Sequence, residues 1–422
     1  MKFAFVTSRY GGDISSGPEH ACRVLAEQVS KRHDVDVLTT CARDPQTWKN
    51  EYSEGTDRVR GALVRRFAVS QARDEVAFAQ FSQRLLNAPR GRADEMEWLK
   101  RAGPWSSGLI EFIRRQHKSY DVLVFFCLSS PLTVAGAQLA PERTIVFPYL
   151  QLQPALRFDV CAEVLTSVRG LGLVSEAERR LLRSYVRATA QHEELVGIGI
   201  DPSPEQSYPR HQQDPADVVV DDELAVASEN AEPESYLSGR GVPFRRRHRL
   251  YGPFALYGGR VEPDNGCEEM LDYFATFAAQ DGDTALALMG VKMMKVPDEP
   301  YIRLAGVLPE RERMVAYEAA DVTIAPSGDD LVSQPLLESL AVGTPVLASA
   351  GNSAAVEHCR RANAGLYYAN RDEFVEALRL LMTNTRLRSR LGENGRNYVR
   401  QHFRWEAVLG RFDRLVSRAR PK

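Results

Sequence analysis

The sequence lacks paired cysteines and a long apolar run. Its six cysteines are scattered and none forms a C-x-x-C pair, so neither a disulfide framework nor a zinc site is expected. No apolar segment reaches the ~18 residues that a membrane span needs, and the apolar run in the opening MKFAFVTSRY is too short for a signal peptide. We therefore expect a cytoplasmic protein with at most peripheral membrane contact.

The sequence also has little excess charge of either sign. The formal net charge is -2, so no overall field attracts nucleic acid. One basic run, RRRHR at residues 245–249, has no interleaved aromatic residues, which favours a solvated helix start over a nucleic-acid contact. The chain of 422 residues is 44% hydrophobic and 26% charged, which is typical of a globular protein and long enough for two domains.

Residues 321–350, DVTIAPSGDDLVSQPLLESLAVGTPVLASA, contain the most informative pattern. They predict a buried strand, a loop with two acids, a helix that begins near Pro335 and ends at Gly343, and a second strand. Ligands bind at such loops in open parallel sheets, and the free N–H groups of a helix start favour phosphate. Asp330 would lie in this loop and Glu338 in the first turn of the helix, close enough to share a ligand; an ordinary βαβ unit with solvated acids is the alternative.

The start of the chain predicts a similar unit. Residues 2–7 are expected to form a strand, Gly11 and Gly12 a loop, Gly17 the start of a helix and residues 35–39 a second strand, which is a Rossmann-like beginning. The G-x-G-x-x-G fingerprint is absent, so a dinucleotide site is only weakly supported.

Three motifs together resemble those of retaining glycosyltransferases with the GT-B fold, family 4-like (glycosyl transferases group 1). They are Asp330 and Glu338 followed by the run Gly343-Thr344-Pro345-Val346, Gly259-Arg260 after the strand at 254–256, and Ser16-Gly17-Pro18-Glu19. The resemblance implies an α/β fold of two Rossmann-like domains that face each other across a cleft, with a C-terminal helix that crosses back to the first domain. The expected divisions are an N-terminal acceptor-side domain 1–200, a linker with a polar insertion 201–249, a nucleotide-sugar domain 250–403 and the crossing helix 404–422.

The resemblance also implies roles for single residues. Asp330 would bind the sugar hydroxyls, Glu338 the ribose, and Arg260 the diphosphate. The other expected donor contacts are Gly17, Gly259, Asn265, Val307 and Leu308, and the N–H groups of Leu331, Val332 and Ser333; the acceptor and sugar side would include Gly12 and Gln151. The partners would be a nucleotide-diphosphate sugar and a hydroxyl acceptor (a glycan, lipid or small molecule), with no cofactor and no metal.

This sequence departs from the family pattern at three places. Asn265 stands where relatives carry a Lys that helps to clamp the diphosphate, and Lys292 or Lys295 is a candidate replacement. Gln151 lies in a run without the ionisable groups of a His-Asp-Glu-like segment, and Pro18 lacks an N–H. Two hypotheses follow: a metal-independent retaining glycosyltransferase, or a GT-B protein without catalysis that serves as a partner subunit or glycan-binding module. A phosphorylase-like enzyme is disfavoured because no cofactor-lysine motif is visible.

Overall fold

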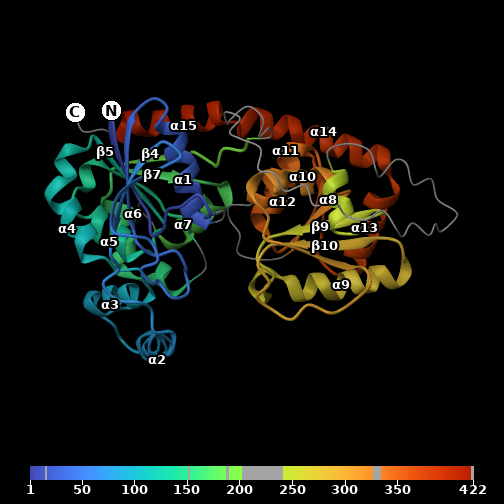
Figure 1. Cartoon of the computed structure of the whole chain (residues 1–422), viewed down its shortest axis with the longest axis horizontal. Coiled ribbons are helices and arrows are strands. Elements are labelled where there is room, and N and C mark those ends of the chain that lie inside the picture. Colours follow the sequence, from blue (N-terminus) through green and yellow to red (C-terminus); the bar gives the residue numbers. More distant parts are fainter. Residues whose placement is uncertain (15–16, 151–152, 187–189, 202–240, 327–333, 420–422) are drawn as a thin grey trace.

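The computed structural model describes residues 1–14, 17–150, 153–186, 190–201, 241–326 and 334–419, which form two α/β halves (Figure 1). Among these residues, the N-terminal half (residues 1–201) contains an eight-stranded sheet, and the C-terminal half (from residue 241) contains a six-stranded sheet. In Figure 1 the first half is blue and green, and the second is yellow to red. The predicted fold class, two Rossmann-like sheets, is confirmed. The exact domain boundaries stay a prediction.

The N-terminal sheet has the order β3-β4-β2-β1-β5-β6-β7-β8, and every pairing is parallel except β3 with β4. β5 is buried along its whole length, as expected for a parallel strand with helices on both faces. Its strands are β1 Lys2–Val6, β2 Asp34–Thr40, β3 Gly55–Val59, β4 Ala62–Phe67, β5 Val122–Phe126, β6 Thr144–Phe147, β7 Gly170–Leu173 and β8 His192–Leu195. The helices of this half are α1 Gly17–Val29, α2 Glu75–Leu86, α3 Arg92–Ala102, α4 Ser107–Gln116, α5 Pro131–Ala137, α6 Asp159–Ser167 and α7 Glu176–Tyr185.

The C-terminal sheet is parallel throughout, in the order β11-β10-β9-β12-β13-β14. Its strands are β9 Phe254–Gly258, β10 Ala285–Met289, β11 Ile302–Gly306, β12 Val322–Ala325, β13 Val346–Ser349 and β14 Gly365–Tyr368. The helices are α8 Val242–Arg247, α9 Cys267–Gln280, α10 Glu310–Ala319, α11 Gln334–Val342, α12 Ser353–Ala362, α13 Arg371–Thr383, α14 Thr385–His402 and α15 Trp405–Ala419.

The two faces of the N-terminal sheet each support a hydrophobic core. Along β1, Phe3 and Phe5 pack with residues of α1 and α15, whereas Ala4 and Val6 pack with residues of α4 to α6. This alternation follows from the two-residue side-chain period of a strand. The core thus joins the C-terminal helix to the first sheet.

The C-terminal helix crosses onto the N-terminal half, as predicted, and Figure 1 shows α14 and α15 following one another along the top of the molecule. Phe412 of α15 lies 6.1 Å from Phe3, measured between ring centroids. A Cβ atom on Gly170 of β7 would lie 3.1 Å from Leu415 Cδ1, so glycine at this position permits the close approach of α15. The N–H of Ile200 donates to the carbonyl of Phe403 at 2.7 Å where the chain passes between the halves.

The structure corrects the prediction for the basic run at 245–249. A helix is present, but it begins at Val242, and Arg245 is buried rather than solvated. Its guanidinium donates to the carbonyls of Gly252 (2.7 Å) and Ala319 (2.6 Å) and lies 3.5 Å from the carboxylate of Asp321. Arg245 therefore anchors the linker end to the C-terminal half.

Asn265 lies just before helix α9. The helix begins at Cys267, because Asn265 ends a short 3-10 turn and Gly266 has a positive φ of 72°. The hairpin of β3 and β4 was not predicted, since the β3 sequence GTDRV is polar and exposed. Ser16 of the Ser16-Gly17-Pro18-Glu19 motif lies outside the described residues. Among the described helices, none is long and apolar enough to span a membrane.

Candidate functional site

Two predicted elements of the donor site lie at the same edge of the C-terminal sheet. β9 pairs directly with β12, and Arg260 follows the end of β9. The loop after β12 leads into α11, which carries Glu338. Carboxyl ends of neighbouring parallel strands are where such sheets bind ligands. Asp330, Leu331, Val332 and Ser333 belong to the segment that the structure does not describe, so their predicted contacts stay predictions.

The loop after β9 is organised by Asn265. Its side-chain amide donates to the carbonyl of Arg260 at 2.9 Å and to Glu262 Oε1 at 3.0 Å. The same Glu262 oxygen lies 2.9 Å from Arg260 Nη2, although the Arg260 side chain is 62% exposed. Asn265 therefore orders this loop but adds no charge to it, and Glu262 offsets part of the charge of Arg260.

The loops after β9 and β10 lie against each other. Gly290 has a φ of 142°, and a Cβ atom there would come within 1.8 Å of the Gly259 carbonyl oxygen. Val261 and Lys292 form a parallel β-bridge just beyond this contact. The structure therefore brings Lys292, one of the two suggested replacement cations, beside the Arg260 loop.

Glu338 lies in α11, and its buried carboxylate accepts hydrogen bonds from polar side chains on both oxygens. Arg313 of α10 donates to it through two nitrogens, Nη2 to Oε1 at 2.6 Å and Nε to Oε2 at 3.2 Å. Gln334 donates to Oε1 at 2.8 Å. Arg313 was not among the predicted site residues. The sequence pattern that could have indicated it is its place on α10, next to the buried Met314 and four positions before the buried Tyr317.

The predicted base contacts are placed at the end of β11. Val307 is 62% exposed and Leu308 is buried in a small core cluster. Their backbone is thus at the edge of the sheet that also carries Arg260, two strands away. Their contact with a nucleotide base stays a prediction.

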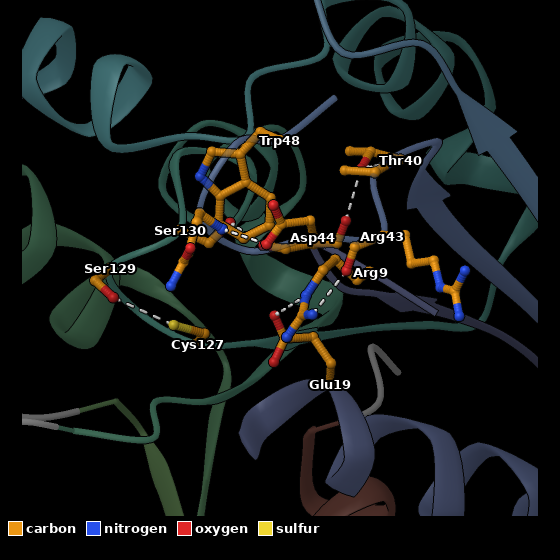
Figure 2. A network of polar contacts seen from close by, with 12 residues as sticks. Arg9, Glu19, Thr40, Arg43, Asp44, Trp48, Cys127, Ser129 and Ser130 are labelled. Atoms are coloured by element: carbon orange, nitrogen blue, oxygen red, sulfur yellow. Dashed lines mark hydrogen bonds and ion pairs between the residues drawn. The ribbon is translucent and has the colours of Figure 1, made fainter. Parts of the chain in front are cut away.

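The N-terminal half presents a polar network at the carboxyl ends of β1, β2 and β5 (Figure 2). The guanidinium of Arg9 lies 3.3 Å from Glu19 Oε1 of α1 and donates to the carbonyl of Arg43 at 2.9 Å. It also lies 5.9 Å from the ring centroid of Trp48. In Figure 2, Arg9 lies between Glu19 and the segment that follows β2. Arg9 thus ties the loop after β1 to α1.

The structure describes Gly17, which was predicted to contact the donor, and Gly12, which was predicted for the acceptor and sugar side. Gly17 begins α1 with a φ of 76°, and a Cβ atom on Gly12 would meet only Arg60 Nε, at 3.9 Å. The neighbouring Asp13 accepts from Arg43 (2.6 Å) and from the hydroxyl of Tyr52 (2.7 Å). Burial raises the pKa of Asp13, but these hydrogen bonds outweigh it and the net shift is downward. The loop that carries Gly12 is therefore fixed at its far end.

The segment after β6, where relatives carry ionisable groups, is held by Glu178 of α7. The Glu178 carboxylate is buried and accepts from the N–H groups of Leu150 (3.0 Å) and Val174 (2.7 Å). Burial raises its pKa to about 7. Tyr149 has a positive φ of 48°. Gln151 lies outside the described residues.

A cavity of about 240 Å³ lies where α7, β8, α12 and α14 meet, and none of the predicted site residues that the structure describes lines it. Its charged groups are already paired: Arg179 with Glu176 (2.6 Å) and Glu193 (2.8 Å), and Glu357 with Arg180 (2.9 Å). This cavity is distinct from the donor edge of the sheet. Within the described ranges, no group of three or more His, Cys, Asp or Glu side chains could hold a metal ion.

The C-terminal half, which carries the predicted donor site, is similar to a known protein family. Residues 243–398 match the model of the family described as "Glycosyl transferases group 1". This segment of the chain therefore belongs to this family. The matched residues include Arg260, Asn265, Glu338 and the Gly-Thr-Pro-Val run.

The curated relatives are only distantly similar to this chain. "D-inositol 3-phosphate glycosyltransferase" of Corynebacterium glutamicum is 21% identical over 83% of this chain and 86% of that protein. "Glycosyltransferase 1 domain-containing protein 1" of Xenopus tropicalis is 25% identical over 46% of this chain. The chain spans only 57% of the length of this frog relative.

Solved structures resemble the whole chain. HepE of Anabaena in complex with UDP and glucose has a TM-score of 0.67 at 13% identity and covers 99% of both chains. Sucrose-phosphate synthase of Thermosynechococcus elongatus has a TM-score of 0.66 at 16% identity, covering 99% of this chain and 98% of that one. These likenesses show the GT-B fold.

Proposed function

We propose that this group 1 glycosyltransferase moves a sugar from a nucleotide-diphosphate sugar to a hydroxyl acceptor, with retention and without a metal. One observation supports this most. Arg260 and the Glu338-bearing helix α11 lie after β9 and β12, two neighbouring parallel strands of the matched C-terminal half. A cation and a helix start at one sheet edge suit a diphosphate with a sugar attached.

Each group at this edge has a proposed part in the reaction. As the bond between the sugar carbon and the diphosphate oxygen breaks, negative charge grows on the diphosphate, and Arg260 and N–H groups of the α11 loop stabilise it. Asp330 holds the sugar hydroxyls and Glu338 the ribose. The acceptor oxygen bonds to the sugar carbon on the face that the diphosphate leaves, and the leaving phosphate oxygen takes the acceptor proton. No side-chain base is then required.

The nucleotide is proposed to be UDP, because HepE was solved with UDP and with UDP-glucose. The acceptor side is proposed to be the edge of the N-terminal sheet where Gly12 and the Arg9–Glu19 pair lie. This edge offers carboxylate, guanidinium and hydroxyl groups that suit a polyhydroxylated acceptor (Figure 2).

Calorimetry with UDP, GDP and dTDP, together with a hydrolysis assay on UDP-glucose, tests the proposal. We expect UDP to bind, and Glu338→Gln to weaken that binding. A purified chain that binds none of the three diphosphates and hydrolyses no donor would contradict the proposed function.

A second candidate is a GT-B protein without catalysis. It is favoured by one observation: the Arg260 charge is offset by Glu262, and Asn265 supplies no replacement. Asn265→Lys separates the two candidates. Gain of donor affinity or turnover in this variant supports a weakened enzyme site, whereas nucleotide binding with no turnover in either protein supports the non-catalytic role.

A further inference from the structure

Arg313 of α10 donates hydrogen bonds to both carboxylate oxygens of Glu338 on the neighbouring helix α11. The two donated hydrogen bonds, 2.6 and 3.2 Å, form the two-pronged geometry for which a planar guanidinium is suited. The Arg313 side chain is 12% exposed and that of Glu338 is 7% exposed. This pair is therefore more than a solvated surface contact, and it fixes the direction of the carboxylate.

The hydrogen bonds from Arg313 leave one acceptor site of the Glu338 carboxylate unoccupied by described residues. A carboxylate has about four lone-pair sites. Among the described residues, Oε1 of Glu338 accepts from Arg313 and Gln334, and Oε2 accepts from Arg313. One site, on Oε2, is left for a further donor such as a hydroxyl group. Arg313 thus selects which oxygen of Glu338 can bind a ligand.

Contacts with the N-terminal half reinforce the position of α10. Glu310, one turn before Arg313, lies 3.6 Å from Nη2 of Arg23, a fully buried side chain of α1. Arg60, in the turn between β3 and β4, approaches the same Glu310 oxygen at 3.9 Å. Buried His20 of α1 has its pKa lowered to about 3 by burial and by the neighbouring Arg23 and Arg313. It therefore stays neutral near pH 7 and adds no charge beside Arg313.

The geometry points to Arg313 as a positioning residue for donor binding, which acts by holding Glu338 with one oxygen directed to a ribose hydroxyl of the nucleotide. This inference rests on the proposed function. It extends the site by a residue of α10 that touches Glu338 rather than the substrate. A residue that only stabilised the fold would have no effect specific to Glu338.

The test is a double-mutant cycle on UDP affinity, with Arg313→Met, Glu338→Gln and the double variant. Losing a positioned, charge-assisted hydrogen bond is expected to weaken UDP binding by about tenfold in Arg313→Met. In the Glu338→Gln background the same change is expected to have little further effect. Arg313→Lys should recover only part of the affinity, because an ammonium group cannot form the two-pronged contact. Arg311→Met, at an exposed position of the same helix, is the matched control.

Each result has a distinct meaning. Wild-type UDP affinity in Arg313→Met would overturn the inference, as would an equal loss in both backgrounds, which would mean that Arg313 acts independently of Glu338. If Arg313→Met does not fold, Arg313→Lys and the double variant, which carries no unpaired Glu338 charge, still decide the question. If the unchanged protein binds no nucleotide diphosphate at all, the proposed function fails rather than the role of Arg313.

Discussion

The carboxylate of Glu178 in α7 accepts a hydrogen bond of 3.0 Å from the backbone N–H of Leu150, three residues after the end of β6. A second bond of 2.7 Å comes from the N–H of Val174 at the end of β7. One buried side chain thus ties the ends of β6 and β7 together. The left-handed backbone of the adjacent Tyr149 shows that this tie holds an unfavourable conformation.

Stability is expected to depend on the ionisation of Glu178. Burial raises its pKa from 4.5 to about 7 in the folded protein. Between these values the unfolded chain ionises while the folded chain stays protonated, so rising pH favours unfolding until the folded carboxyl ionises near pH 7. The free energy of unfolding should therefore fall by up to about 3 kcal/mol between pH 4 and pH 8, beyond any change over the same range in Glu178→Gln. Thermal unfolding of both proteins across this range measures the difference.

Glu176→Gln on the same helix is the control for this prediction, because the Glu176 side chain is partly exposed and paired with Arg179. A constant difference in unfolding midpoint between the protein and Glu178→Gln at all pH values would show that Glu178 does not titrate in this range. At low pH, Glu178→Gln should be less stable than the unchanged protein, since the amide of Gln has one acceptor oxygen for the two N–H groups of Leu150 and Val174.

Removing the acid beside Arg260 should strengthen donor binding. Glu262 pairs with Arg260 at 2.9 Å and would also repel a bound diphosphate. Exposed ion pairs contribute up to about 1 kcal/mol, so Glu262→Gln is expected to raise UDP affinity roughly two- to fivefold. Calorimetry at low and high salt measures this, and the gain should shrink as salt screens the site. Glu268→Gln, exposed in the first turn of α9, should not change affinity.

The contact between Gly259 and Gly290 predicts a steric effect. Alanine at 290 would place a Cβ atom 1.8 Å from the Gly259 carbonyl oxygen at a φ that L-residues avoid. Gly290→Ala should therefore destabilise the C-terminal half by about 1–3 kcal/mol from backbone strain alone. The added Cβ atom should also displace the Arg260 loop. Thermal unfolding and UDP binding together test this. In Gly282→Ala the added Cβ has no atom within 4 Å, and unchanged behaviour is expected there; equal effects in both variants would contradict the steric explanation.

Sequence patterns predicted the fold because its determinants are local. Short apolar runs such as residues 322–325 alternate with helices whose starts and ends carry Pro and Gly signals, and this alternation indicates parallel α/β sheets. The strand β3 was missed because an exposed edge strand has no buried face and hence no apolar period. Motifs that lie within one loop or helix, such as Gly259-Arg260, were also found.

Partners far apart in the sequence were not predictable. Arg313 and Glu338 are separated by a strand and a loop, and only the packing of α10 beside α11 makes them meet. The role of Asn265 shows the same limit, because its sequence context indicates the lost charge but not the hydrogen bonds to Arg260 and Glu262. Such pairings depend on tertiary structure, which a single sequence does not encode in any local pattern.

Arg245 provides the clearest test of this point. Five consecutive basic residues look alike in the sequence, but only a buried Arg245 reaches Asp321 and the carbonyls of Gly252 and Ala319. Asp321 would lose this partner in Arg245→Met, and the buried carbonyl of Ala319 and the part-buried carbonyl of Gly252 would lose their donor, so stability should fall by about 2–4 kcal/mol. Arg246→Met changes an exposed neighbour and should shift stability by less than about 0.5 kcal/mol. Equal unfolding midpoints for the two variants would mean that the basic run is solvated throughout.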